Sequence, residues 1–293
     1  MTDTYKYKKI DAFTSGNSLG NPAACLYLAP GQKLSELQML DIAKQHKGFV
    51  SEVIYCESHD ENIKLTYYSS ECEVDFCGHG TIACMYSLIK DTPALLNQKE
   101  ISIRTSKKGE LTVYNRVKEQ DAILITAPSP SYIGTQFDTD CISAKLCVAQ
   151  SAIDTAYPVN LIDAGLRTLI VPLCDLPTEI SIFPQELVLK AFCLENDIDI
   201  VLIFSRQTKD SEAVAHTRVF APKFGYLEDP ATGSGNSAFG YYMLKNELWD
   251  GSNCIIEQGG NDRVFNRIHL SQKDGNVLFG GSATVRIDGS YYI

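Results

Sequence analysis

The sequence predicts an α+β protein made of two similar, pseudo-symmetric halves, each a group of strands wrapped around one central buried helix. Three observations support this class: an internal repeat, a Gly-x-Gly turn before an apolar helix in each half, and a shared order of elements. The repeat aligns Thr232–Gly235 with Cys77–Gly80, an offset of 232 − 77 = 155 residues. The same offset pairs further identical residues, Glu228 with Glu73, Ala238 with Ala83, Tyr241 with Tyr86 and Lys245 with Lys90. A repeat of this length indicates two domain-sized halves and not a solenoid.

The composition is that of a soluble globular protein. The chain has 293 residues, 44% of them hydrophobic and 21% charged, which leaves room for two ordinary domains. No apolar run approaches the roughly 18 to 20 residues that a membrane helix needs, and Met1–Lys8 has no apolar core of the secretory kind. We therefore expect a cytoplasmic protein that binds no membrane.

The charge balance excludes one class of partner. A net charge of −10 and a pI near 5.0 argue against nucleic-acid binding, which requires Lys and Arg gathered on one face. The ten cysteines are expected to be reduced thiols, because a chain of this length needs no disulfide staples.

The first half opens with two predicted strands, over residues 10–13 and 24–28, on either side of the turn-rich loop 14–22. This loop contains Asn21 and is a candidate wall of the site.

A helix follows the second strand. Ser35 as N-cap and Gln38 three residues later form a capping box, and the helix is expected to end near Gly48. Its predicted apolar face consists of Leu37, Leu40 and Ala43.

The rest of the first half is predicted to be strands around one helix. The strands cover residues 49–56, 63–68, 100–105, 110–114 and 122–127. The helix over residues 81–90 follows the Gly78–Gly80 turn and is apolar nearly all round, so it is expected to be buried.

The second half repeats this order. Pro184, in a first-turn position, is predicted to start a helix over residues 185–194. Strands follow over residues 198–205 and 216–221, then the Gly233–Gly235 turn opens a helix over 236–248, and a hairpin of residues 268–271 and 277–279 mirrors residues 101–114. Two prolines in Pro128–Ser131 place the boundary, giving halves of residues 1–128 and 129–293, with the last strand free to return to the first half.

The two glycine turns have a chemical consequence if the halves are pseudo-symmetric, because both helix N-termini would then face one cleft. Each N-terminus offers unpaired N–H groups and roughly half a positive charge. Together they would receive a carboxylate or a developing enolate-like anion. This arrangement suits chemistry on an acidic carbon next to a carboxylate.

Three groups are candidates for that chemistry. His79 lies at a predicted helix start and can act as acid or hydrogen-bond donor near neutral pH. Asp229, Thr232 and Ser234 supply a carboxylate and two hydroxyls beside bare glycine backbone, more than capping requires. Glu52 is an acid inside an apolar strand, and burial would make it a usable base.

Other interpretations of these motifs are weaker. Cys72, Cys77, His79 and Cys84 resemble a metal cluster, but their spacing lacks the C-x2-C pairs of structural zinc, so no metal is expected. Both glycine turns echo a dinucleotide fingerprint without the clean preceding strand. Cys77 at a helix N-terminus is an alternative base as a thiolate, although its repeat partner Thr232 rules out a two-thiol relay.

Several motifs together resemble the phenazine-biosynthesis PhzF-like isomerase family. They are Asp11–Phe13, Gly20–Ala24, Ser51–Glu52, Cys77–Thr81 and the block Glu228–Ser234. The resemblance covers nearly the whole chain and implies a diaminopimelate-epimerase-like fold, in which two domains of curled, mostly antiparallel sheet each enclose a helix. It also implies a cofactor-independent enzyme, usually a homodimer.

The resemblance implies residue roles as well. Glu52 stands at the position of the acid that moves a proton between carbons of a cyclohexadiene carboxylate. His79 and Asp229 match residues that orient the substrate and assist proton delivery. Predicted substrate-binding residues are Asn21, Gly78, Thr232, Gly233 and Ser234. Gly80 stands where the family commonly has Pro or Ala, and Val53 where it commonly has Thr.

These observations favour an isomerase that moves a proton on a small carboxylate, similar to trans-2,3-dihydro-3-hydroxyanthranilate isomerase. Two alternatives remain open. One is a racemase, epimerase or dehydratase that uses Cys77 as base with Thr232 opposite. The other is a non-catalytic metabolite-binding or protein-interaction module.

Overall fold

The computed structural model describes residues 4–59, 62–135, 137–260 and 264–293, so the first three residues of the N-terminal stretch discussed above lie outside it. The chain forms two compact units. The first comprises Met1–Thr14, Leu19–Thr126 and Gly280–Ile293, and the second Ser15–Ser18 and Ala127–Phe279. The division of the sequence into an N-terminal half, residues 1–128, and a C-terminal half, residues 129–293, stays a prediction.

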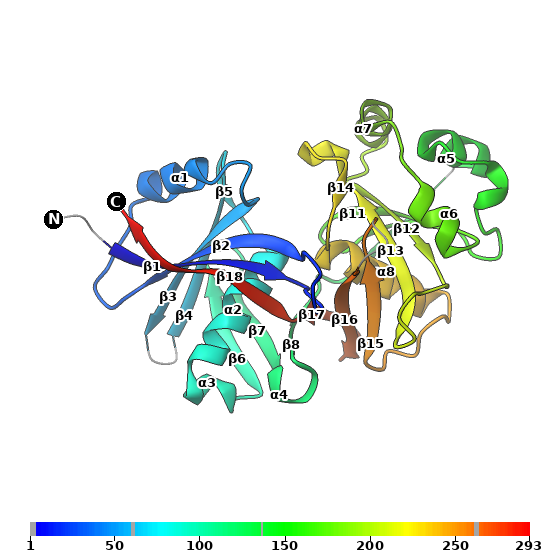
Figure 1. Ribbon diagram of the computed structural model, residues 1–293. Coiled ribbons are helices and arrows are strands. Elements are labelled where there is room, and N and C mark those ends of the chain that lie inside the picture. The colour runs from blue at the N-terminus through cyan, green and yellow to red at the C-terminus, as the bar shows by residue number, and fades with distance from the viewer. Residues whose placement is uncertain (1–3, 60–61, 136, 261–263) are drawn as a thin grey trace. The chain divides into compact units, whose positions relative to one another are not determined.

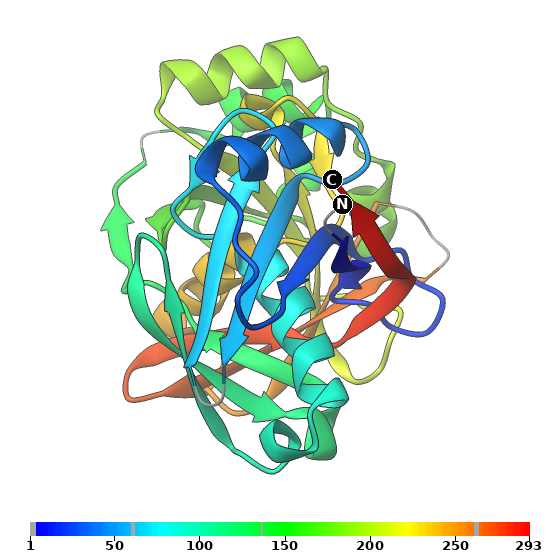
Figure 2. The same cartoon turned by 90° about the vertical axis from the view of Figure 1, so that its left-hand side faces the viewer.

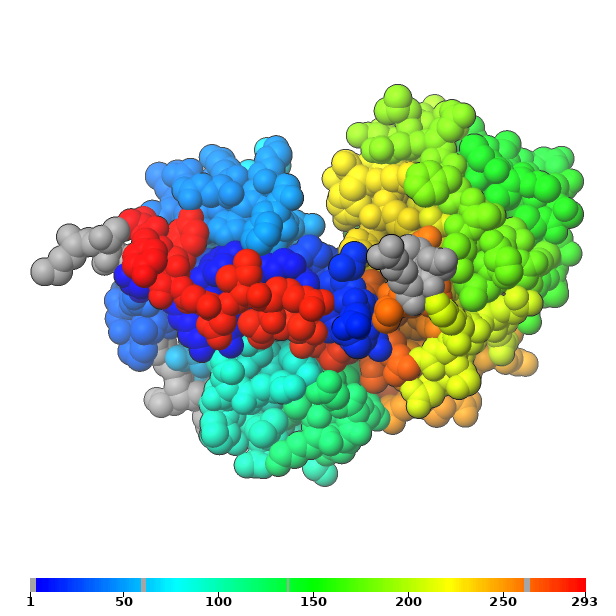
Figure 3. All heavy atoms as spheres, in the orientation of Figure 1, coloured from blue at the N-terminus to red at the C-terminus, as the bar shows by residue number. Residues whose placement is uncertain are grey.

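The first unit is a mixed, mostly antiparallel sheet with four helices among its described residues. Its strands are β1 (Thr4–Ala12), β2 (Asn21–Leu28), β3 (Glu52–His59), β4 (Asn62–Ser69), β5 (Glu73–Val74), β6 (Glu100–Thr105), β7 (Gly109–Arg116), β8 (Ala122–Thr126) and β18 (Ala283–Tyr292). Its helices are α1 (Glu36–Gln45), α2 (Gly78–Asp91), α3 (Pro93–Leu96) and α4 (Val117–Gln120). The pairs β2–β3 and β4–β6 are parallel. The last strand, β18, pairs antiparallel with β1, and Figure 3 shows its residues along the surface.

Helix α2 is the centre of the first unit. Nine of its fourteen residues are buried, and it contacts β1, β2, β3, β8 and β18, so the sheet wraps around it (Figures 1 and 2). Helix α1 packs on the other face of the same sheet, where Ile42 and Ala43 join a core cluster with Val53 and Tyr55. Strand β3 is therefore covered on both faces, which explains why it is an apolar run and not a strictly alternating strand.

The second unit has the same construction around α8 (Gly233–Lys245), ten of whose thirteen residues are buried. Its strands are β9 (Ser131–Ile133), β10 (Asn160–Asp163), β11 (Arg167–Pro172), β12 (Ile200–Ser205), β13 (Ala213–Phe220), β14 (Glu228–Asp229), β15 (Cys254–Gln258), β16 (Asn266–Lys273) and β17 (Asn276–Gly281), the last two residues of which belong to the first unit. The other helices are α5 (Thr139–Leu146), α6 (Leu176–Ser181) and α7 (Glu186–Glu195), with short turns of 3-10 helix at Gln150–Ala152 and Pro222–Phe224. Helix α8 contacts β10, β11, β12 and β16.

The internal repeat reappears in the topology. Helices α2 and α8 begin 233 − 78 = 155 residues apart, and strands β5 and β14 begin 228 − 73 = 155 residues apart. The parallel pairs β11–β12 and β13–β15 correspond to β2–β3 and β4–β6. The same offset corrects one prediction. The hairpin of β16 and β17 corresponds to β7 and β8, and not to β6 and β7, which contain residues 101–114. The unpredicted strand β15 is the counterpart of β6.

The start of α1 was predicted correctly, and of its predicted apolar face Ala43 is buried and Leu40 packs against the core, so only Leu37 was predicted wrongly. Ser35 and Gln38 make both hydrogen bonds of the capping box. Leu37, however, is 74% exposed, because the buried side carries Ile42 and Ala43 with Met39 packed beside them. Leu37 precedes Met39 by two residues, which is about 200° around a helix of 3.6 residues per turn.

The other helix starts also differ from the predictions. Helix α7 has Gln185 as N-cap, so Pro184 lies before the helix and not in its first turn. Helices α2 and α8 begin at Gly78 and Gly233, three residues earlier than predicted, and the glycines form the first turn itself. In the described part of the chain, no helix has both the length and the apolar character needed to cross a bilayer.

Candidate active site

Strand β3 aims Glu52 at the start of α2. Alternate residues of a strand share a face, and two of the residues that alternate on β3, Val53 and Tyr55, belong to the cluster under α1. Ile54 faces the other way and lies against the second glycine of α2, Gly80. Glu52 is therefore on the α2 side of the sheet, as a partly exposed carboxylate next to the buried Ile54 and Cys56 on the same side.

Cys77 caps α2 with its thiol. Its backbone is extended, with φ −133° and ψ 108°, and its Sγ accepts the N–H of Gly80 at 3.3 Å. A side chain at residue 80 would force its neighbours to shift, since a Cβ there would lie 2.7 Å from Ile54 Cδ1 and 2.9 Å from Cys77 Sγ. Glycine at this position lets the thiol and the strand approach the helix closely.

Glu52, Cys77 and His79 come together at this helix start. His79 Nε2 lies 3.3 Å from Glu52 Oε2. Cys77 Sγ lies 3.7 Å from the same oxygen and 3.6 Å from His79 Nδ1. The side chains of Glu52 and His79 are 21% and 15% exposed, so both reach solvent while most of their surface is enclosed. A carboxylate and an imidazole at this distance can pass a proton or hold one between them.

The start of α8 is built differently. Thr232 occupies the N-cap in an extended conformation, but its hydroxyl makes no capping hydrogen bond. Instead Thr232 Oγ1 donates to Asp229 Oδ2 at 2.6 Å. Asp229 is held by the short strand β14, which pairs with Val219 and Phe220 of β13.

Gln258 organises this second helix start, and the sequence did not identify it. Its Nε2 donates to the carbonyl of Asp229 at 2.9 Å and to Thr232 Oγ1 at 3.2 Å, and its Oε1 accepts the N–H of Thr232 at 2.9 Å. Because Thr232 Oγ1 receives a hydrogen from Gln258, its own hydrogen is directed to Asp229. Asn236 completes the set with a bond of 2.7 Å to Gln258 Oε1.

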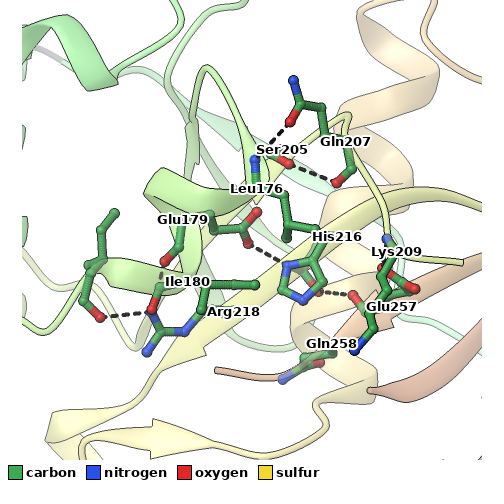
Figure 4. A network of polar contacts seen from close by, with 12 residues as sticks. Leu176, Glu179, Ile180, Ser205, Gln207, Lys209, His216, Arg218, Glu257 and Gln258 are labelled. Carbon is green, nitrogen blue, oxygen red and sulfur yellow. Dashed lines mark hydrogen bonds and ion pairs between the residues drawn. The ribbon is translucent and has the colours of Figure 1, made fainter. Parts of the chain in front are cut away.

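A buried charged network lies next to the strand that carries Asp229, and Figure 4 shows its members Glu179, His216 and Arg218. Arg218 is 1% exposed and forms a two-point ion pair with Glu228, both contacts at 2.9 Å. It also donates to the carbonyls of Glu179, Ile180 and Ile182 at the end of α6. The ion pair thereby holds Glu228 in place, and with it the backbone of the adjoining Asp229.

Glu179 and His216 complete the network and are both fully buried, with Glu179 Oε1 3.0 Å from His216 Nδ1. Burial raises the pKa of the Glu179 carboxyl, and the nearby His216 and Arg218 oppose that rise in pKa.

The remaining predicted residues are found near the two helix starts or in the first strands. Gly78 and Gly233 are the first residues of α2 and α8, and Ser234 is partly exposed in the first turn of α8. Asn21 is buried at the start of β2. The described residues bring Glu52, Cys77 and His79 together in the first unit and Asp229 with Thr232 in the second. The roles assigned to all of them stay predictions.

Comparison with known proteins agrees with this construction. The model of the family "Phenazine biosynthesis-like protein" matches residues 10–289. An uncharacterized isomerase, YfhB, of Bacillus subtilis is 26% identical, with 96% of this chain and 94% of the relative covered. A Schizosaccharomyces pombe protein called antisense-enhancing sequence 1 is 29% identical over the full length of both chains.

Solved structures show the same fold. A PhzF-family phenazine biosynthesis protein of Bacillus anthracis superposes with a TM-score of 0.84 at 24% identity, covering 99% of each chain. A predicted epimerase of Pseudomonas aeruginosa, PA4716, superposes with a TM-score of 0.73 at 17% identity, covering 98% of this chain and 99% of that one. The chain belongs to the phenazine biosynthesis-like protein family, with its epimerase-like α+β fold, and it is an isomerase.

Proposed function

We propose that this isomerase moves a proton between two carbons of a small carboxylate substrate without a cofactor, with Glu52 as the base and the acid. The observation that carries the proposal is the Glu52 carboxylate held 3.3 Å from His79 Nε2 at the N-terminus of α2. The acid and the imidazole can transfer a proton, and the adjacent helix N-terminus can bind the anionic group of the substrate.

The reaction proceeds in two steps under this proposal. Glu52 takes a proton from the carbon to be deprotonated, and the electron pair left behind spreads toward the substrate carboxylate. Glu52, now protonated, returns the proton to a second carbon, so the substrate is isomerised and the enzyme is unchanged. His79 donates a hydrogen bond to the developing negative charge.

The first turn of α2 is suited to receive the substrate carboxylate. The first four N–H groups of a helix have no acceptor within it. At this helix Gly80 donates to Cys77 Sγ and Thr81 to the Cys77 carbonyl, which leaves Gly78 and His79 as the donors without a partner among the described residues. Two N–H groups at the positive end of a helix form an anion site.

Further parts of the proposal come from the family resemblance. Asp229 and Ser234, with Asn21, Thr232 and Gly233, would orient the substrate and assist proton delivery. A dihydro-hydroxyanthranilate is the substrate that the family resemblance suggests. We also propose a cytoplasmic homodimer.

The test is incorporation of solvent deuterium into the substrate. A panel of small carboxylates with an acidic carbon, including dihydro-hydroxyanthranilate, is incubated with the enzyme in D₂O and followed by proton NMR. We expect exchange with at least one member, reduced by roughly 10²- to 10⁴-fold in Glu52→Gln. Glu57→Gln is the matched control, because Glu57 lies on the same strand but pairs with Lys64 at the surface. Undiminished exchange in Glu52→Gln would refute the assignment of the base.

One observation supports a second candidate, a racemase or epimerase that uses Cys77. The thiol accepts an N–H at a helix start and lies 3.6 Å from His79, two features that favour a thiolate, while the Glu52 carboxylate 3.7 Å away opposes it. Its counterpart Thr232 is a hydroxyl already bonded to Asp229, so a second base of the same kind is missing at the equivalent position.

A further inference from the structure

The first-unit cluster combines three kinds of metal-ligating side chain. Within the described residues, one group of His, Cys, Asp and Glu side chains offers ligand atoms that all lie within 4.8 Å of one another, and it consists of Glu52, Cys77 and His79. The sequence suggested a different set, with Cys72 and Cys84 in place of Glu52. Cys84 is fully buried inside α2 and Cys72 is exposed in a turn, so neither belongs to this group.

The spacing of the three ligand atoms is that of a tetrahedral zinc site. Zinc bonds of about 2.0 to 2.3 Å at tetrahedral angles separate ligand atoms by roughly 3.3 to 3.7 Å. Here Glu52 Oε2 lies 3.3 Å from His79 Nε2 and 3.7 Å from Cys77 Sγ, and the sulfur lies 3.9 Å from the same nitrogen. With one sulfur ligand, the distances from the sulfur to the other two ligand atoms are about 3.5 Å in such a site, so both distances to Cys77 Sγ must shorten by a few tenths of an ångström when an ion enters.

The chemistry of the ligands selects the ion. A thiolate and an imidazole favour zinc and similar ions over magnesium or calcium, which prefer oxygen ligands. Three protein ligands leave a fourth position for water, as in zinc sites that stay open. The thiol of Cys77 must lose its proton to bind, and the N–H of Gly80 already stabilises its anion. The thiolate and the carboxylate then balance the two charges of the ion.

We propose that Glu52, Cys77 and His79 form a zinc-binding site and that zinc reversibly inhibits the enzyme. The ion binds the oxygen of Glu52 that would accept the substrate proton, and it also binds the His79 nitrogen that faces this oxygen. Binding itself depends only on the geometry of the cluster, while inhibition rests on the proposed function. The partial exposure of Glu52 and His79 gives the ion access from solvent.

Binding is measured on the full chain after removal of metal with a chelator. Zinc alone is titrated in competition with a chromogenic chelator, and cobalt is used in parallel because cobalt–thiolate bonds absorb in the near ultraviolet. We expect one tight site per chain with a thiolate absorption band. Removing a ligand should cost more than the roughly 10- to 100-fold that loss of an outer hydrogen bond to a ligand costs, so Cys77→Ser and His79→Asn should lower the affinity by more than about 100-fold.

Cys72→Ser is the matched control, since Cys72 is an exposed cysteine five residues away and outside the cluster. It should keep the affinity and the absorption band of the wild type. Circular dichroism verifies that each variant is folded. Equal zinc affinity in the wild type and in folded Cys77→Ser would overturn the site.

Inhibition has a separate readout. Deuterium exchange should fall at least tenfold when the site is filled and recover on addition of a chelator. Exchange that persists at saturating zinc would overturn the claim of inhibition but not the claim that the three residues bind zinc. If no carboxylate exchanges at all, the proposed function fails, and the Cys77-dependent cobalt band still decides the binding site.

Discussion

The two central helices start in the same way but carry different chemistry. Cys77 and Thr232 are equivalent N-caps, with nearly identical backbone angles and the same 6% exposure. The thiol of Cys77 caps its helix and contacts Glu52 and His79. The hydroxyl of Thr232 leaves its helix uncapped and is bonded to Asp229 and Gln258.

The two helix starts also differ in how closely their polar side chains are paired. In the first unit, the acid and the imidazole lie 3.3 Å apart, slightly longer than an ordinary hydrogen bond between nitrogen and oxygen, and the thiol contacts both of them at 3.6 to 3.9 Å. In the second unit the contacts are 2.6 to 3.2 Å and are tied to a buried arginine. Loosely paired groups can exchange protons, whereas a satisfied network holds a carboxylate in one orientation.

The strands show the same asymmetry. Ile54 and Ile200 each lie against the second glycine of their helix, Gly80 and Gly235. Two residues before Ile54 stands Glu52, but two residues before Ile200 stands Ile198, which is fully buried in the core of the second unit. Both units therefore have the central helix, but at this strand position the first unit has an acid, Glu52, and the second has Ile198. That both helix starts serve one substrate stays a prediction.

The largest expected effect on stability tests the rigidity of the second unit. Replacing Arg218 by Met removes its hydrogen bonds to Glu228 and to three carbonyls, and breaking an ion pair whose arginine is fully buried costs about 3 to 5 kcal/mol of unfolding free energy. Urea unfolding measures it. Arg104→Met is the control, because Arg104 and Glu110 pair at the surface, 69% and 72% exposed, and such pairs contribute less than about 1 kcal/mol. Equal losses of unfolding free energy in both variants would show that the buried network of Arg218 does not stabilise the second unit.

A smaller effect is expected from Gln258→Ala. The variant loses hydrogen bonds to Asp229, Thr232 and Asn236, each contributing about 0.5 to 1.5 kcal/mol, so a loss of roughly 2 to 4 kcal/mol is expected. Deuterium exchange should also fall, through kcat more than through KM, because Asp229 loses its orientation. The exposed amide of Gln150, for which the described residues provide one hydrogen-bond partner, Thr139 Oγ1, provides the control variant Gln150→Ala. Unchanged kcat in a folded Gln258→Ala variant would remove its positioning role.

The glycines at equivalent positions compare the two halves directly. In Gly80→Ala the new Cβ would lie 2.7 Å from Ile54, but in Gly235→Ala the closest atom is 3.2 Å away. Overpacking costs about 1 to 3 kcal/mol, while alanine improves helix propensity by up to roughly 1 kcal/mol. We expect Gly80→Ala to destabilise the protein by about 1 to 2 kcal/mol and Gly235→Ala to be nearly neutral. Thermal unfolding of both variants measures the difference, and equal losses would contradict the closer packing of the first helix.

The smallest effect concerns pH. Because burial raises the pKa of Glu179 above its usual 4.5, the folded protein holds this proton at pH values where the unfolded chain has lost it. Stability from this group therefore falls as pH rises above about 4.5 toward the raised pKa. Glu179→Gln has no such titration, so its stability relative to the wild type should rise with pH over that range. A difference between the two proteins that does not change with pH would show that Glu179 titrates normally.

Local signals predicted the elements that define the fold. The Gly-x-Gly turns and the all-round apolar composition predicted both central helices, and the capping box of Ser35 predicted the start of α1. Helices α5 and α6 were missed although Asp138 and Asp175 cap them, because an isolated Asp is as typical of a turn as of an N-cap.

The site was predictable only where its residues carry a motif. His79 and Asp229 stand in recognisable blocks, and the prediction that Glu52 is the base rests chiefly on the family resemblance. Its orientation follows from alternation with Ile54, but the contact of Ile54 with Gly80 is tertiary and has no sequence signal. Gln258 and Arg218 are polar residues in buried strands. This position hints at a buried network, yet their partners come from segments 10 to 39 residues away along the chain.

The central claim is that Glu52, and not Cys77, moves the proton. The most direct measurement is the rate of deuterium incorporation into one exchanging carboxylate by wild type, Glu52→Gln and Cys77→Ser at equal concentration in chelator-treated buffer. We expect the rate to fall by roughly 10²- to 10⁴-fold in Glu52→Gln and by less than about tenfold in Cys77→Ser. The reverse order, with Cys77→Ser inactive and Glu52→Gln active, would contradict the account and favour a thiolate base.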